Sequence, residues 1–121
     1  MKRACVAIIL LAVVLGVAGW YVVRDRYFSP LVSVELRNAA KQPIEEVRLT
    51  YKLGTVIVRN IRCGEAKTAR FNPGPGESTY SLVIRFRGGK TLKGGGGYVE
   101  PGYRMQETIT EKRVKTRLTL P

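Results

Sequence analysis

The sequence predicts an all-β domain, an immunoglobulin- or fibronectin-like antiparallel β-sandwich of about seven strands, preceded by one N-terminal transmembrane helix. Two observations predict the sandwich: apolar and polar residues alternate in short stretches after residue 26, and turn-forming residues separate these stretches about every 8 to 12 positions. A third observation, an uncharged apolar run near the start of the chain, predicts the helix. The predicted parts are a cytoplasmic tip (1–3), a signal-anchor helix (4–23), a juxtamembrane hinge (24–30) and an exported domain (31–121).

The N-terminal run predicts both a membrane crossing and its direction. Residues 4–23 contain no charged side chain, and a helix of this length spans roughly the 30 Å of a bilayer's hydrocarbon. Lys2 and Arg3 precede the run, whereas the charges of residues 24–26 nearly balance. The positive-inside rule therefore keeps the tip in the cytoplasm and exports the domain.

A cleaved signal peptide is the alternative, because Ala18 and Gly19 could end the apolar run at a peptidase site. Signal peptides carry apolar stretches of about 7–15 residues, and this run is longer, which favours an uncleaved anchor. In either case we expect the domain outside the cytoplasm, in the periplasm of a bacterium or in the extracellular space.

Period-two alternation places the strands and the core. Strands are expected at 31–38, 45–53, 56–62, 68–72, 78–87, 106–110 and 113–120. Residues 44–62 read as a hairpin with its turn at Gly54–Thr55. The side chains predicted to meet in one core are Leu49, Tyr51, Leu82, Ile84, Phe86 and Leu118.

Residues 84–104, "IRFRGGKTLKGGGGYVEPGYR", resemble a phosphate-binding loop at Gly89-Lys90-Thr91 only. The first glycine of that motif would fall on Ile84, and a glycine run follows where the motif requires a helix. The segment instead predicts a two-residue turn at Gly88–Gly89, a return strand starting at 90–93 and a mobile loop over Gly94–Gly97. A type II turn is expected at 100–103, with proline second and glycine third.

Basic residues and tyrosines interleave around this predicted loop. Such a surface can bind a polyanion or a protein partner, because loops on a rigid scaffold commonly carry recognition. The competing interpretation is a solvent-exposed strand face, which is usually charged. The candidate binding residues are Arg85, Arg87, Lys90, Lys93, Tyr98, Tyr103 and Arg104.

The residue content argues against catalysis. The chain has no histidine, the commonest general base and metal ligand. Glu45 and Glu46 are neighbours on an expected strand, so their carboxylates should point to opposite faces. Cys63 is the one cysteine of the exported part and is expected to be a buried small side chain. We therefore predict no enzyme, no catalytic residue, no metal and no cofactor.

Charge and location together suggest a binding role. Of the 21 Lys and Arg residues only Lys2 and Arg3 precede residue 24, which leaves 19 against 9 Asp and Glu and a net charge of +10 for the exported part. Such a field favours an anionic surface or an acidic protein. An exported domain rarely meets nucleic acid, which is not an expected partner.

The leading hypothesis is a membrane-anchored envelope protein whose basic sandwich binds another envelope component, protein or polyanion. One alternative is an inhibitor or immunity-type protein that blocks a toxic or lytic enzyme. Another is a structural subunit of an envelope assembly, whose helix packs through Gly16 and Gly19. The oligomeric state stays open.

Overall fold

The structure, a computed structural model, describes residues 2–27 and 30–120, with side chains for residues 5–20 and 30–119. It comprises one helix, α1 (Lys2–Tyr27), followed by β-strands that make up most of the remaining chain. The strands are β1 (Val32–Asn38), β2 (Ile44–Tyr51), β3 (Gly54–Ile61), β4 (Ala66–Phe71), β5 (Ser78–Phe86), β6 (Thr91–Val99), β7 (Arg104–Ile109) and β8 (Val114–Leu120). The described chain therefore has eight strands. β6 starts where a return strand was predicted, at 90–93, but continues through the glycines that were predicted to form a mobile loop.

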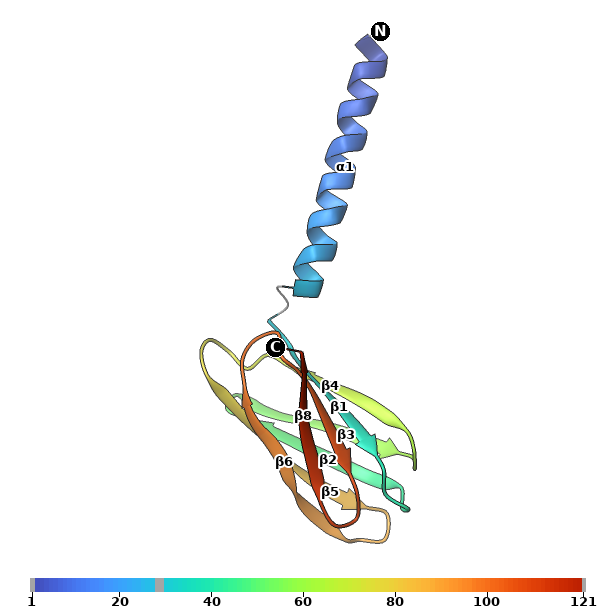
Figure 1. Cartoon of the computed structure of the whole chain (residues 1–121), viewed down its shortest axis with the longest axis vertical. Helices are drawn as coiled ribbons and strands as arrows, with labels where there is room; N and C mark the ends of the chain where they lie inside the picture. The colour runs from blue at the N-terminus through green and yellow to red at the C-terminus, as the bar shows by residue number, and fades with distance from the viewer. Residues whose placement is uncertain (1, 28–29, 121) are drawn as a thin grey trace.

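The strands form two four-stranded sheets packed face to face (Figure 1). The first sheet has the order β4-β1-β7-β8 and the second has the order β3-β2-β5-β6. A β-sandwich is thus confirmed. The strand order differs from that of immunoglobulin domains. There the first two strands share a sheet, whereas here β1 and β2 lie in different sheets. Strand pairing is also not wholly antiparallel, since β1 and β7 run parallel.

The core lies between the two sheets and is built by the predicted alternation. Along β5 buried residues alternate with more exposed ones, as expected of a strand with one face inward. Leu49, Leu82, Ile84 and Phe86 are almost completely buried, which confirms four of the six predicted core residues.

Two predicted core residues behave differently. Tyr51 is only half-buried, and its ring stacks on that of Phe71 with centroids 4.5 Å apart. Leu118 is 46% exposed, so its placement in the core is wrong. It lies on β8, the edge strand of the first sheet, where no further strand of the described chain covers it.

Two turns differ from their predicted places. Tyr51 pairs with Gly54, so Lys52 and Leu53 form the β2–β3 turn rather than Gly54 and Thr55. After β5 the N–H of Gly89 donates to the carbonyl of Phe86 at 2.9 Å, which gives a loop of residues 87–89. Gly89 has a φ of 91°, a conformation that favours glycine at the end of such a loop.

The type II turn over 100–103 forms as predicted. The N–H of Tyr103 donates to the carbonyl of Glu100 at 3.1 Å. Gly102 has a φ of 90°, as the third position of this turn requires.

Helix α1 extends away from the sandwich (Figure 1). Its large apolar side chains between Val6 and Trp20 are exposed at successive positions, and therefore on every side of the helix. Among the residues that the structure describes, no helix is long and apolar enough to cross a membrane, so the structure does not support the predicted crossing. Residues 24–27 of the predicted hinge belong to α1, and residues 28–29 lie outside the described residues.

Candidate functional site

The seven predicted binding residues do not form one cluster. Arg85, Arg87, Lys90 and Lys93 lie around the β5–β6 turn, at the end of the sandwich away from α1. Tyr98, Tyr103 and Arg104 lie at the other end, around the turn that joins β6 to β7. Lys93 pairs with Val83 and Tyr98 with Thr79, four residues apart on β5, which is roughly 13 Å at 3.3 Å per residue. The first group defines the distal end of the sandwich and the second the proximal end.

The two groups are separated because Gly94–Gly97 belong to β6. Leu82 pairs with Gly94 and Tyr80 with Gly97, so Gly95 and Gly96 form a bulge in the strand. Both have positive φ, +72° and +83°. A Cβ on Gly96 would lie 2.0 Å from the carbonyl oxygen of Tyr80, and one on Gly95 would lie 2.8 Å from Oε2 of Glu107. Glycine is therefore required at both positions for packing.

At the bulge, the backbone of β6 approaches the interior of the sandwich and contacts a buried carboxylate. Glu107 on β7 has no exposed surface. Its Oε1 accepts hydrogen bonds from the hydroxyl of Tyr80 at 2.5 Å and from the N–H of Gly96 at 2.9 Å. Its Oε2 accepts one from the hydroxyl of Thr116 at 2.8 Å. Burial, and then the hydrogen bond to Glu107, raises the pKa of Tyr80 far above its usual value.

At the distal end, three turns that are distant in sequence are tied together. Glu111, in the β7–β8 turn, accepts a hydrogen bond at Oε1 from the N–H of Lys41, in the β1–β2 connection. The Nζ of Lys90 donates to the carbonyl of Glu111 at 2.8 Å. The N–H of Arg87 donates to the carbonyl of Pro43 at 3.0 Å. The β1–β2, β5–β6 and β7–β8 turns therefore present their side chains on one connected surface.

Asn38 stabilises the distal end of the sandwich through buried hydrogen bonds. It is 1% exposed, and its Nδ2 donates to the carbonyls of Gln42 at 2.9 Å and Ile61 at 3.0 Å. Its Oδ1 accepts from the N–H of Ala40 at 2.9 Å. These bonds fix the β1–β2 connection against the end of β3, so the distal turns are preorganised.

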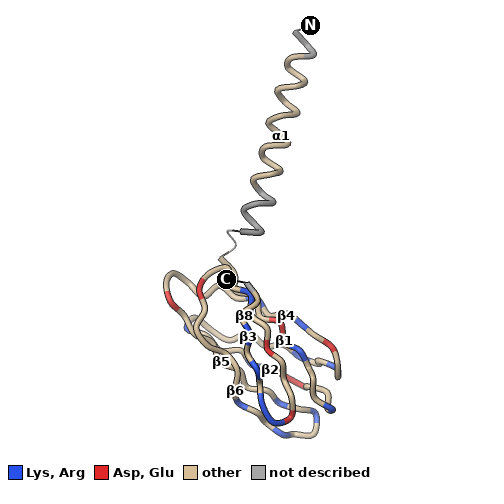
Figure 2. Tube along the Cα trace, in the orientation of Figure 1, with Lys and Arg blue, Asp and Glu red and all other residues tan. Residues whose placement is uncertain are grey.

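The connected turns are strongly basic. They carry five exposed cations, and their one carboxylate, Glu111, is already bonded to Lys41. Figure 2 shows Lys and Arg along the turns at this end of the sandwich. The hydrogen bond from Lys41, with the charges of Lys41 and Lys90, lowers the pKa of Glu111. We call the following set the distal basic surface: Lys41, Arg87, Lys90, Lys112 and Arg113.

Arg85 and Lys93 adjoin this surface on the outer face of the second sheet. A register irregularity between Ile44 and Glu46 changes the alternation of β2, so the prediction for its two glutamates is wrong. Both carboxylates contact arginines of this outer face: Glu45 contacts Arg85 at 3.2 Å, and Glu46 contacts Arg48 at 3.0 Å. The charge of Arg85 is thus offset by its ion pair with Glu45, which leaves the turns as the more basic region.

At the proximal end, the two tyrosines pack together. The rings of Tyr98 and Tyr103 have centroids 6.3 Å apart in an edge-on arrangement. The hydroxyl of Tyr98 donates to Glu100, and this bond raises the pKa of Tyr98 to about 12. Arg104 follows on the first sheet, where it pairs with Ser33 of β1.

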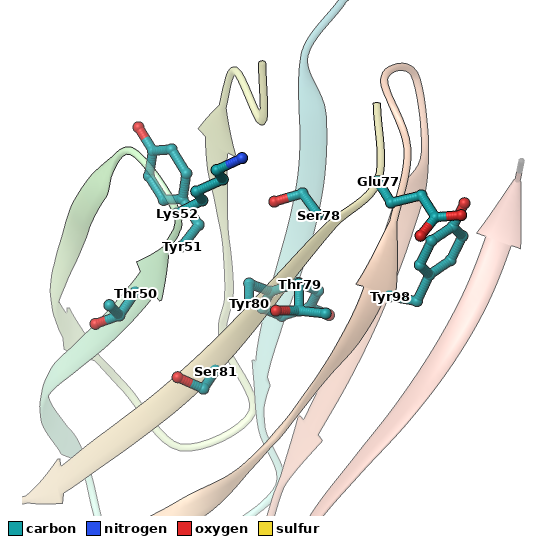
Figure 3. A pocket seen from close by; sticks show the side chains of 9 residues that line it. All are labelled: Thr50, Tyr51, Lys52, Glu77, Ser78, Thr79, Tyr80, Ser81 and Tyr98. Carbon is teal, nitrogen blue, oxygen red and sulfur yellow. The ribbon is translucent and has the colours of Figure 1, made fainter. Parts of the chain in front are cut away.

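A shallow groove of about 560 Å³ lies beside Tyr98, on the second sheet. Figure 3 shows Lys52 on one side of it and Glu77 with Tyr98 on the other. The Oγ of Ser78 beneath it is buried and has no hydrogen-bond partner among the described residues. Seven of the nine lining residues carry a hydroxyl group, and the other two are Lys52 and Glu77.

Sequence reasoning missed Lys41, Lys112 and Arg113, because they come from turns far from the glycine-rich segment. It also missed Glu107, which looked like an ordinary strand residue. No signal in the sequence marks their positions, since the contacts depend on which turns meet. Cys63 is exposed in the turn after β3, so its expected burial is wrong.

The described residues define a small two-sheet β-sandwich with an N-terminal helix and one strongly basic end. No protein-family model matches the chain, and no curated protein matches it significantly. The NMR structure of a protein from Eubacterium rectale is similar, with a TM-score of 0.55 at 11% identity, over 76% of this chain and 91% of that one. At this identity the similarity shows the fold alone.

Proposed function

We propose that this chain is a non-catalytic binding protein of the cell envelope, whose distal basic surface binds an anionic component, a polyanion or an acidic face of a protein. The observation that carries the proposal is the convergence of five cations from three turns that are hydrogen-bonded to one another. A fixed set of like charges attracts anions and loses little side-chain and loop entropy on binding.

The proposal keeps the N-terminal segment as the attachment to a membrane, with the sandwich outside the cytoplasm. Its support is the uncharged run 4–23 and the exposure of apolar side chains around α1 from Val6 to Trp20. A helix that is apolar on all faces must be covered, by lipid or by other protein. Covering by other helices, through Gly16 and Gly19, would correspond to a structural subunit of an envelope assembly.

An inhibitor of an envelope enzyme is a second candidate, because preorganised protruding turns also suit insertion into an enzyme cleft. The two candidates differ in stoichiometry and in salt dependence. A polyanion bound through exposed charges dissociates as salt is added. An enzyme held by packed contacts forms a one-to-one complex that resists salt.

A charge-reversal experiment tests the proposed surface. Arg87, Lys112 and Arg113 are suitable because no described hydrogen bond or ion pair uses their side chains. Replacing all three by Glu should abolish binding of the full chain to an acidic polysaccharide, with little change in melting temperature.

The matched control reverses three exposed cations elsewhere, Lys52, Lys115 and Arg117, and alters the net charge equally. Binding should be weakened much less in this control than in the distal variant. Equal losses in both variants would mean that total charge, and not the distal basic surface, governs binding.

A further inference from the structure

A second groove, of about 390 Å³, lies on the first sheet at the proximal end, separate from the distal basic surface. It crosses β4, β1, β7 and β8, where β1 begins, β7 begins and β8 ends. Unlike the groove beside Tyr98, it is flanked by two arginines. Its lining residues are Ser33, Glu35, Thr68, Arg70, Arg104, Met105 and Thr119.

The two arginines stand on either side of one serine. Ser33 pairs with Arg70 on β4 and with Arg104 on β7, so the three residues form one row across neighbouring strands. With strands about 4.8 Å apart, the two arginine Cα atoms lie roughly 10 Å from each other. Both side chains are exposed, on the face away from the core.

Neither guanidinium has a partner within the described part of the chain. No ion pair or side-chain hydrogen bond of Arg70 or Arg104 is formed among residues 5–20 and 30–119. The nearby carboxylate, that of Glu35, is bonded to Nε of Arg37 at 2.8 Å. The row therefore presents two unneutralised cations.

The rest of the lining suits a tetrahedral oxyanion. Ser33 and Thr68 bring hydroxyl groups, which can donate to oxygens that the arginines do not reach. The hydroxyl of Thr119 already donates to the carbonyl of Arg104 at 2.8 Å, which fixes the end of β8 against the start of β7. Two forked donors on either side of a serine hydroxyl match the several oxygens of a phosphate better than the two of a carboxylate.

We infer that this groove is a phosphate-binding site. Arg70 and Arg104 bind the phosphate group from two sides, and Ser33 lies beneath it. The phosphate is either free or the monoester head group of a lipid. Ser33 is the second residue of β1, the first strand after α1, so the site lies at the end of the sandwich nearest the helix (Figure 1). The inference does not depend on the proposed function of the distal basic surface.

The test uses the full chain in neutral detergent micelles, with backbone amide shifts followed by NMR. Inorganic phosphate is one probe, and micelles doped with phosphatidic acid are the other. Sodium acetate at equal ionic strength controls for charge alone. Either phosphate probe should shift the amides of Ser33 and Arg104, and acetate should not.

Variants then locate the site. Arg70→Gln and Arg104→Gln should each weaken binding about tenfold, as loss of a charge-assisted hydrogen bond does, and the double variant should lose it. Arg117→Gln, on the same outer face but outside the groove, and the distal charge reversal should both bind normally. A melting curve for each variant shows that the fold is retained.

Each outcome decides the inference. Saturation by inorganic phosphate supports a general phosphate site, and saturation by phosphatidic acid alone supports a lipid head-group site. No response to either probe, a response equal to that of acetate, or a response that survives in the double variant would overturn the inference.

Discussion

The hydroxyl of Tyr80 donates a hydrogen bond of 2.5 Å to the carboxylate of Glu107, and the two residues belong to opposite sheets. This bond joins the sheets through polar groups inside an apolar core. A buried carboxylate is costly unless its oxygens are satisfied. Here Tyr80, Gly96 and Thr116 supply three donors.

Removing the Tyr80 hydroxyl should therefore destabilise the sandwich. Tyr80→Phe leaves Oε1 of Glu107 with one donor fewer in a buried place, which should lower the free energy of unfolding by about 1–3 kcal/mol. Tyr98→Phe is the matched control, because its hydroxyl bonds the exposed Glu100, and it should change stability by less than about 0.5 kcal/mol. Urea unfolding measures both. Equal effects would show that the Glu107 contact contributes nothing specific.

The glycine bulge should tolerate substitution at some positions and not at others. Gly96→Ala places a methyl group against the Tyr80 carbonyl at a positive φ and should cost at least about 3 kcal/mol. Gly94→Ala meets only Val114, at ordinary contact distance, and should cost less than about 1 kcal/mol. If both variants unfold at the same denaturant concentration, β6 does not have the bulged conformation.

Adjacent positions on β5 should differ sharply. Phe86 has no exposed surface, and Phe86→Ala should lower stability by about 3–5 kcal/mol, enough to unfold a small domain or nearly so. Arg85→Ala removes an exposed ion pair with Glu45 and should cost less than about 1 kcal/mol. Thermal melts compare them. Comparable losses would contradict the alternation on which the core depends.

The contact between the distal turns should weaken in acid. The pKa of Glu111 lies below the usual 4.5, chiefly because of the hydrogen bond from Lys41, so the charged form stabilises the folded turn. That stabilisation is present above pH 4.5 and is lost as the pH falls through the lowered pKa. The amide shift of Lys41 should titrate with a midpoint below 4.5. Lys90→Gln, which removes one of the nearby charges, should move the midpoint upward, and an unmoved midpoint would exclude Lys90 from the contact.

Much of the sandwich could be predicted because alternation reports which face of a strand is buried. Leu82, Ile84 and Phe86 follow the pattern in sequence and in the structure. The pattern fails where packing depends on strand neighbours. Leu118 alternates correctly but lies on an edge strand, and sequence does not state the order of strands in a sheet. The immunoglobulin-like strand order was expected for the same reason, because alternation does not show which strands are neighbours.

Gly94–Gly97 show a second limit. A glycine run carries no apolar alternation, so it reads as a loop, although here glycine is needed for a close backbone approach to Tyr80 and Glu107. This error placed in one candidate site two groups of residues that the structure separates. Arg87 and Lys90 were found because they adjoin the run. Lys41 could not be found, since only the folded chain brings the β1–β2 connection to them.

Mapping the residues that respond to an acidic polysaccharide tests the central claim most directly. The full chain is titrated in neutral detergent, and backbone amide shifts are recorded for the whole sandwich. The distal basic surface predicts that the largest shifts fall in residues 39–43, 87–90 and 110–113, and that they vanish as salt is raised. Largest shifts at the proximal turns, residues 52–53 and 100–103, with the distal turns unchanged, would contradict it.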